Sequence, residues 1–126
     1  MSSFIIEGGK PLSGTIPVQG AKNAVLPILA ATICCDNGVS VIKNCPSLKD
    51  VTITIEILKE LGVKVSRNAS TLTIDARGHV GHRIPERLMR ELRSSIIFMG
   101  AILARKHKAK ISMPGKSARA KSVTLW

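Results

Sequence analysis

The stretch Gly20–Pro27 (GAKNAVLP) places a lysine and an amide side chain where a short strand gives way to an apolar helix. The first backbone N–H groups of a helix have no partner inside the helix, and the helix dipole adds partial positive charge there. Lys22 beside those N–H groups predicts a site for a phosphate or a carboxylate. Asn23 can either cap the helix or contact a ligand.

A second cation, Arg93, has the matching place in what looks like a repeat. From Lys22 to Pro46 the sequence gives a basic residue, an apolar helix, a polar turn, a short strand and a proline, and the stretch from Arg93 to Pro114 gives the same order. This agreement indicates internal duplication. We therefore expect Lys22 and Arg93 to lie on a common wall and to face anionic groups of bound ligands. The alternative is that Arg93 is the polar start of a buried helix segment.

The elements that must position these residues are short strands and helices. The segment Asn23–Cys34 is apolar nearly all round, which predicts a buried helix, with Pro27 in its first turn. The apolar residues that follow the loop 46–50 recur at helical spacing up to Gly62, which ends a second helix. The remaining expected elements are strands at 4–6, 15–18, 39–42, 63–65, 70–74 and 109–111, a hairpin turn at 68–69, a loop at 78–85 and a third helix at 85–105. This order predicts the α/β (α+β) class, with short sheets covered by helices.

The composition predicts one globular domain in the cytoplasm. The 126 residues are 44% apolar and 2% aromatic, and we find neither a secretory signal nor an apolar run that could span a membrane. Cys34, Cys35 and Cys45 are odd in number and lack spaced partners, so we expect neither disulfides nor a zinc site. The three histidines show no metal spacing either, and we expect no metal and no cofactor.

The net charge of +11 is concentrated in the second part of the chain, where residues 81–126 hold eleven Lys and Arg against two Asp and Glu. Such a field favours an anionic partner: a nucleotide sugar, a phosphorylated metabolite, nucleic acid or an acidic segment. Phe4, Phe98 and Trp126 do not interleave with the basic residues, so nucleic acid is not favoured. We interpret 105–108 (RKHK) as an exposed turn.

Four motifs in order, GAKNAVLP at Gly20–Pro27, LKDV at Leu48–Val51, LGVKV at Leu61–Val65 and RSSI at Arg93–Ile96, closely resemble the UDP-N-acetylglucosamine enolpyruvyl transferases. The resemblance implies part of an inside-out α/β barrel of repeated units. It also implies a division of the chain into three parts. Residues 1–21 are strands that in the family belong to the other domain, and residues 22–115 are a partial transferase domain with two repeat-like units. Residues 116–126 are a divergent basic tail.

The resemblance also implies residue roles. Lys22 matches the family lysine that contacts phosphoenolpyruvate, Asn23 matches the residue at the sugar, and Arg93 matches an arginine associated with the nucleotide-sugar site. The Lys-Asn pair favours the UDP-sugar branch over the shikimate-pathway branch, which usually has Lys-Ser. The loop cysteine of the family is absent, and Ser117 stands at its ungapped place. A serine is a far weaker acid than a thiol, so the catalytic acid and base stay unassigned.

The implied reaction is the transfer of enolpyruvate from phosphoenolpyruvate to the 3-hydroxyl of UDP-N-acetylglucosamine, in peptidoglycan synthesis. The resemblance covers less than a third of a typical family chain, so we expect a truncated form that is inactive alone. Two alternatives stay open. One is a non-catalytic basic module on the same fold that binds an anion or nucleic acid, and the other is an oligomer in which several copies replace the missing repeats.

Overall fold

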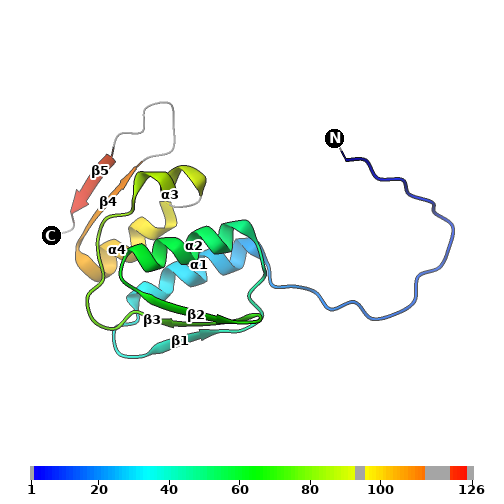
Figure 1. Cartoon of the computed structure of the whole chain (residues 1–126), viewed down its shortest axis with the longest axis horizontal. Coiled ribbons are helices and arrows are strands. Elements are labelled where there is room, and N and C mark those ends of the chain that lie inside the picture. Colours follow the sequence, from blue (N-terminus) through cyan, green and yellow to red (C-terminus); the bar gives the residue numbers. More distant parts are fainter. Residues whose placement is uncertain (1, 93–95, 113–119, 125–126) are drawn as a thin grey trace.

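The computed structural model describes residues 2–92, 96–112 and 120–124, without the side chains of residues 112 and 120–123. Figure 1 shows α1 and α2 lying over one small sheet, and α3 and α4 beside a second. The elements in chain order are α1 (Lys22–Ala31), the 3-10 turn η1 (Thr32–Cys34), β1 (Val39–Ile42), α2 (Lys49–Glu60), β2 (Lys64–Asn68), β3 (Thr71–Asp75), α3 (Glu86–Glu91), α4 (Ile97–Lys106), β4 (Lys108–Ser112) and β5 (Ala120–Thr124).

The first sheet has the antiparallel order β1-β3-β2, with β3 in the centre. Period-2 alternation puts Leu72 and Ile74 of β3 into the core beneath the helices, where they are 0% and 1% exposed. The predicted hairpin between β2 and β3 is confirmed, with its turn at Ala69-Ser70, one residue later than expected. The second sheet pairs β4 with β5, and an isolated parallel bridge joins Arg83 to Lys110 beside it. The strand β5 was not expected from the sequence.

The first two predicted helices are confirmed, although α1 is less buried than its composition indicates. It packs against α2 and α4, and its buried residues Val25, Leu26, Leu29 and Ala30 lie on that side. Ile28, by contrast, is 47% exposed, because the described elements cover only part of the helix surface. The prediction of a helix buried all round is therefore wrong. α2 is amphipathic as expected and ends at Glu60, two residues before Gly62, which has a φ of +90°.

The third predicted helix, residues 85–105, is wrong as a single element. α3 ends at Glu91, and Leu92 has extended backbone with a ψ of 101° before α4 begins at Ile97. The side chain of Leu92 is 1% exposed. Burial of that side chain in the core accompanies the break, a tertiary effect that overrides local helix propensity.

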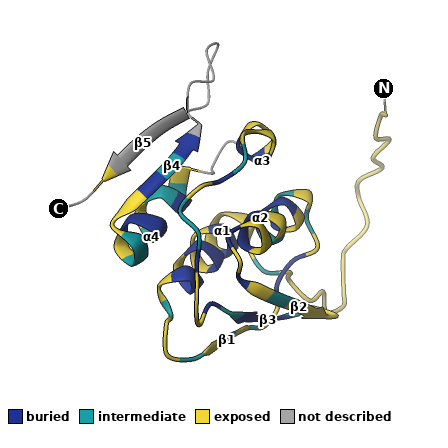
Figure 2. Cartoon of the chain, turned by 60° about the vertical axis from the view of Figure 1, so that its left-hand side comes forward, coloured by how far each residue is buried: buried dark blue, intermediate teal, exposed yellow. Residues whose placement is uncertain are grey.

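The two strands expected at 4–6 and 15–18 do not form. Residues 2–20 are without assigned helix or strand and run outward from the body, as Figures 1 and 2 show. Their apolar side chains are almost fully exposed, Phe4 at 92% and Ile5 at 93%. Strand-forming residues make a strand only when a partner edge supplies hydrogen bonds, and no described element does so here.

Arg105 corrects the interpretation of 105–108 as an exposed turn. Its half-buried guanidinium donates hydrogen bonds to the carbonyls of Ile33, Ala76 and Gly78 at 2.9, 2.9 and 3.2 Å. His107 does occupy the expected turn, with a left-handed φ of +60° after α4. Arg105 thus ties α4 to the end of η1 and to the chain after β3.

The core joins both groups of elements. Figure 2 shows buried residues on the surfaces that the helices and sheets turn toward each other. The largest fully buried side chains of the core include Phe98 and Ile102 from α4, Leu29 from α1 and Leu58 from α2. Each contributes about 1.5–3 kcal/mol through removal of apolar surface from water. Within the described residues, no helix is both long enough and apolar enough to cross a membrane.

Candidate functional site

The entry into α1 is fixed by a close backbone approach at Gly20. A Cβ atom at this position would lie 2.3 Å from the carbonyl oxygen of Asn44, so a side chain has no room. The loop that it meets is held in turn by Arg67, whose guanidinium donates hydrogen bonds to the carbonyls of Cys45 and Pro46 at 3.2 and 3.4 Å. Position 20 therefore requires glycine, and the close contact that glycine allows sets the position of the first turn of α1.

The first turn of α1 carries Lys22 and Asn23 at its open end. Ala21 is the N-cap, and its carbonyl accepts hydrogen bonds from the backbone N–H groups of Ala24 and Val25 at 3.2 and 3.0 Å. Asn23 is the second residue of the helix, and no side chain in the described residues caps α1. Of the two alternatives for Asn23, capping does not occur, and its exposed side chain lines the pocket described below.

Lys22 forms an ion pair with Asp50, in the first turn of the neighbouring helix α2. The distance between Nζ of Lys22 and Oδ2 of Asp50 is 2.6 Å, and the side chains are 53% and 26% exposed. A carboxylate in the first turn interacts favourably with the dipole of α2, and the ion pair adds little to stability because it is solvated. The ammonium that the sequence predicted for an anion therefore has a carboxylate partner in this structure.

These residues line one pocket with a volume of about 520 Å³. This size is within the range of small-molecule sites. Its described lining comes from the ends of four helices and consists of Lys22, Asn23, Leu26 and Pro27 of α1, Asp50 of α2, Glu91 of α3 and Ile97 of α4. Lys22, Asn23, Asp50 and Glu91 supply polar groups, and the other three supply apolar surface.

The charge of this lining differs from the sequence-based expectation. The described lining includes the Lys22 ammonium, which is paired with the carboxylate of Asp50, and a second acidic side chain, that of Glu91. Arg93, the expected second cation, lies outside the described residues, and so does Ser117. The expectation of a common cationic wall from Lys22 and Arg93 therefore stays a prediction. The described part of the pocket suits a ligand that offers hydrogen-bond donors as well as an acidic group.

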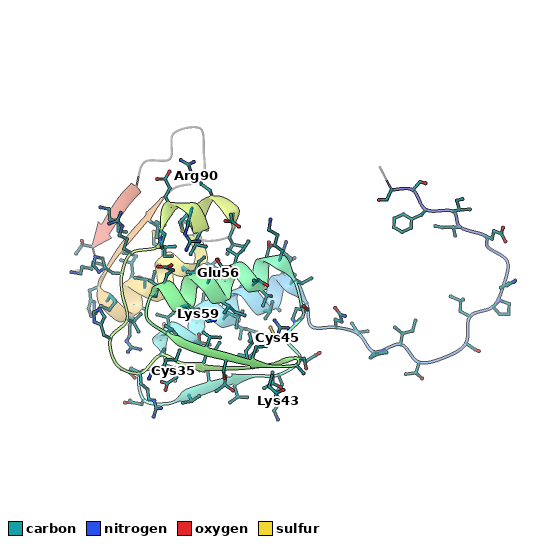
Figure 3. The ribbon with its side chains drawn as sticks, viewed as in Figure 1. Cys35, Lys43, Cys45, Glu56, Lys59 and Arg90 are labelled. Carbon is teal, nitrogen blue, oxygen red and sulfur yellow. The ribbon has the colours of Figure 1, made fainter. Side chains whose placement is uncertain are left out.

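The three cysteines lie away from this chemistry. All three are free thiols, and Figure 3 shows Cys35 and Cys45 at separate places along the first sheet. Burial raises the pKa of the Cys45 thiol, and the nearby Arg67 guanidinium opposes this only in part. The described residues contain no group of three or more His, Cys, Asp or Glu that could hold a metal ion.

Comparison with known proteins agrees with the motifs. The sequence model of the family described as EPSP synthase (3-phosphoshikimate 1-carboxyvinyltransferase) matches residues 6–121. The chain belongs to this family. The resemblance on which the sequence analysis rests is thereby confirmed.

Two curated members of the enolpyruvyl transferase family illustrate the match. The chain is 56% identical over 115 residues to UDP-N-acetylglucosamine 1-carboxyvinyltransferase 2 of Caldanaerobacter subterraneus, a match that covers 91% of this chain and 27% of the relative. It is 42% identical over 118 residues to the UDP-N-acetylglucosamine 1-carboxyvinyltransferase of Desulfatibacillum aliphaticivorans, covering 94% of this chain and 28% of that protein. The chain thus spans a little more than a quarter of the length of these relatives.

The fold agrees with the family. The structure is similar to that of the enolpyruvyl transferase NikO from Streptomyces tendae, with a TM-score of 0.76 at 21% identity, over 94% of this chain and 31% of that one. This likeness confirms the expected fold class, part of an inside-out α/β architecture with short sheets and covering helices.

Sequence reasoning missed two residues of the pocket. Asp50 lies inside the LKDV motif that carried the resemblance, yet it received no role, and Glu91 was not considered. The sequence did contain a signal for Asp50. An acidic residue in the first turn of an amphipathic helix marks the N-terminal end of that helix, where the helix dipole attracts negative charge. Glu91 offered no such signal, since its place follows from the break between α3 and α4.

Proposed function

We propose that this chain carries part of the substrate site for transfer of enolpyruvate from phosphoenolpyruvate to the 3-hydroxyl of UDP-N-acetylglucosamine. The observation that carries the proposal is that Lys22 and Asn23, which come from the motif most specific to the UDP-sugar branch, line one pocket of about 520 Å³. The names of the two curated relatives support UDP-N-acetylglucosamine as the acceptor and transfer of a carboxyvinyl group to it. Peptidoglycan synthesis in the cytoplasm is the context that we propose for it.

The residue types suit the chemistry. In the addition step a base removes the proton of the sugar hydroxyl, the hydroxyl oxygen bonds to C2 of phosphoenolpyruvate, and an acid donates a proton to C3. The resulting tetrahedral intermediate keeps both the phosphate and the carboxylate. Loss of phosphate and of a proton from C3 then restores the double bond. Lys22 can stabilise the acidic groups of this intermediate, and the Asn23 amide can hydrogen-bond to a sugar hydroxyl. Arg93 is our proposed second cation for the nucleotide sugar.

We propose further that the chain does not turn over alone. The intermediate carries several negative charges, whereas the described pocket offers one ammonium, which is already paired with Asp50. Proton transfer also needs an acid and a base at the reacting atoms, and neither the motifs nor the described lining assigns either role to a residue of this chain. These functions would come from the part of the relatives' length that this chain does not span.

Calorimetric titration with UDP-N-acetylglucosamine tests the site. We expect saturable binding that Lys22→Ala and Asn23→Ala each weaken by about tenfold, equivalent to one lost charged or polar contact. Lys59→Ala is the matched control, because Lys59 is exposed near the other end of α2 (Figure 3), about 14 Å along that helix from Asp50. Equal losses in all three variants, or no binding at all, would remove the proposed site.

Phosphate release tests the activity. We expect no phosphate above background from the purified chain with phosphoenolpyruvate and UDP-N-acetylglucosamine together. Robust turnover would show that the chain is a complete catalyst and would overturn the proposal of inactivity.

One observation favours a second candidate, a non-catalytic basic module. The bridge between Arg83 and Lys110 places two cationic residues side by side, and Lys108 shares the face of β4 with Lys110. Such a row would attract a polyanion, with affinity that falls steeply as salt is added. A salt-dependent gel shift with RNA or DNA, without saturable UDP-sugar binding, would favour this candidate over the transferase.

A further inference from the structure

The ion pair between Lys22 and Asp50 determines what an incoming anion meets in the pocket. Nζ of Lys22 lies 2.6 Å from Oδ2 of Asp50, and both residues line the same cavity. The Lys22 ammonium carries three N–H donors, so it can bind Asp50 and a ligand at once. Asp50 is thus a resident carboxylate at the place where an acidic ligand group would sit.

Repulsion between the Asp50 carboxylate and an incoming anion outweighs any benefit that the ion pair gives by holding the Lys22 side chain in place. The lysine side chain is 53% exposed, so an ion pair of this kind holds it only weakly. A ligand phosphate beside Lys22 would lie within a few ångströms of the Asp50 carboxylate, and Glu91 adds a second negative charge to the lining. At an effective dielectric between that of a protein surface and that of bulk water, one like charge at that range lowers affinity by about tenfold or more. The described lining is therefore a poor site for a bare anion.

For a ligand with hydroxyl or amide donors next to its acidic group, favourable hydrogen bonds offset the repulsion between like charges. Its donors can bind the carboxylates of Asp50 and Glu91, and hydrogen bonds to an ionised acceptor are the stronger kind. Its acidic group then shares the Lys22 ammonium. Leu26, Pro27 and Ile97 supply apolar surface for a sugar ring or an acyl group in the same pocket.

We propose that Asp50 is a specificity-determining residue of this pocket: it excludes bare phosphate and admits sugar phosphates whose hydroxyl or amide groups bind its carboxylate. The inference rests on the proposed function, because it refines the ligand of the same pocket. It goes beyond the family resemblance, which gave Asp50 no role.

The test compares two probes that share a phosphate and differ in donors, inorganic phosphate and N-acetylglucosamine 1-phosphate. Binding is measured by calorimetry at low ionic strength for the unaltered chain, for Asp50→Asn and for the control Asp75→Asn. Asp75, the last residue of β3, is a half-buried carboxylate paired with Arg77. Its neutralisation changes the net charge by the same amount as Asp50→Asn, but outside the pocket. We expect the unaltered chain and Asp75→Asn to prefer the sugar phosphate by about tenfold or more.

In Asp50→Asn we expect phosphate to bind about tenfold more tightly and the sugar phosphate to gain less, so that the preference falls to about threefold or below. Asp50→Glu should keep the original preference, because it retains the charge. The double variant Lys22→Ala, Asp50→Asn should lose the gained phosphate affinity. Damage to α2 would weaken both probes, opposite to the expected gain, and thermal melts monitor it.

Three outcomes overturn the inference: equal shifts for both probes in Asp50→Asn, the same change in Asp75→Asn, or no binding of either probe to any variant. The proposed function fails separately, through the absence of UDP-N-acetylglucosamine binding sensitive to Lys22→Ala. If Asp50→Asn changes the selectivity but UDP-N-acetylglucosamine does not bind, the inference of a sugar-phosphate pocket holds and the proposed nucleotide-sugar substrate is refuted.

Discussion

Replacement of Arg105 by methionine should destabilise the whole fold more than its position in a basic run suggests. The guanidinium donates three hydrogen bonds, at 2.9, 2.9 and 3.2 Å, to the carbonyls of Ile33, Ala76 and Gly78. Hydrogen bonds from charged donors contribute about 1.5–3 kcal/mol each when buried. Arg105 is half-buried, and water can replace part of these contacts, so we expect a total loss of about 2–3 kcal/mol. For a domain with a stability of about 5–15 kcal/mol, this is a large fraction.

Urea unfolding followed by far-UV circular dichroism measures the loss. Arg87→Met is the matched control, because Arg87 forms exposed ion pairs with Glu56 and Glu60 at 3.7 and 3.0 Å and should lose no more than about 1 kcal/mol. We expect a midpoint shift for Arg105→Met several times that of the control, with an unchanged m value. If the two variants unfold at the same urea concentration, the idea that Arg105 ties α4 to η1 and β3 is refuted.

Three further predictions concern single positions. Gly20→Ala should lower stability by about 1–3 kcal/mol and weaken ligand binding, as calorimetry and thermal melts would show, because its Cβ would lie 2.3 Å from the Asn44 oxygen. Ala69→Gly should raise the free energy of unfolding by up to about 1 kcal/mol in urea titrations, since Ala69 has a left-handed φ of +54°. Hydrogen bonds from Arg77 lower the pKa of Asp75 from 3.8 to about 2, so the pair favours folding at pH above about 4 and this contribution is lost as the pH falls through about 2. In Arg77→Gln, an NMR titration should show the pKa of Asp75 return toward 3.8; an unchanged value would contradict the assignment.

Local signals predicted the elements between residues 22 and 75 well. The bounds of β1 agree with the expected strand, and α2 ends before Gly62, which takes the left-handed backbone that a helix end requires. These elements are set by periodicity and by glycine punctuation, both of which act within a few residues of sequence.

Elements that depend on distant partners were not predictable in this way. No proline or glycine lies between Glu86 and Ile97, so the break at Leu92 has no local signal. The reverse holds for residues 4–6 and 15–18, whose composition favours strands but which have no partner edge in the described chain. In both cases the tertiary environment decides, and single-sequence periodicity does not contain it.

The site was half predictable for the same reason. Lys22 and Asn23 are adjacent in sequence and share one helix turn, so a motif could carry them together. Asp50 and Glu91 come from other helices and share a pocket with Lys22 only because α1, α2 and α3 bring their ends together there. Their carboxylates change the chemistry of the pocket from a simple anion site to one that needs donors from the ligand.

The charge of the pocket also bears on how the chain's net charge of +11 should be interpreted. Long-range positive potential speeds the approach of anions and is screened over about 8–10 Å at physiological salt, whereas affinity is set by the groups within contact distance. In the described pocket those groups are one ammonium and two carboxylates. The basic composition therefore indicates faster encounter with an acidic ligand but not tight binding of it. Affinity for a substrate that carries both phosphate and carboxylate requires further cations against this pocket, which is why Arg93 is the next residue to test by substitution.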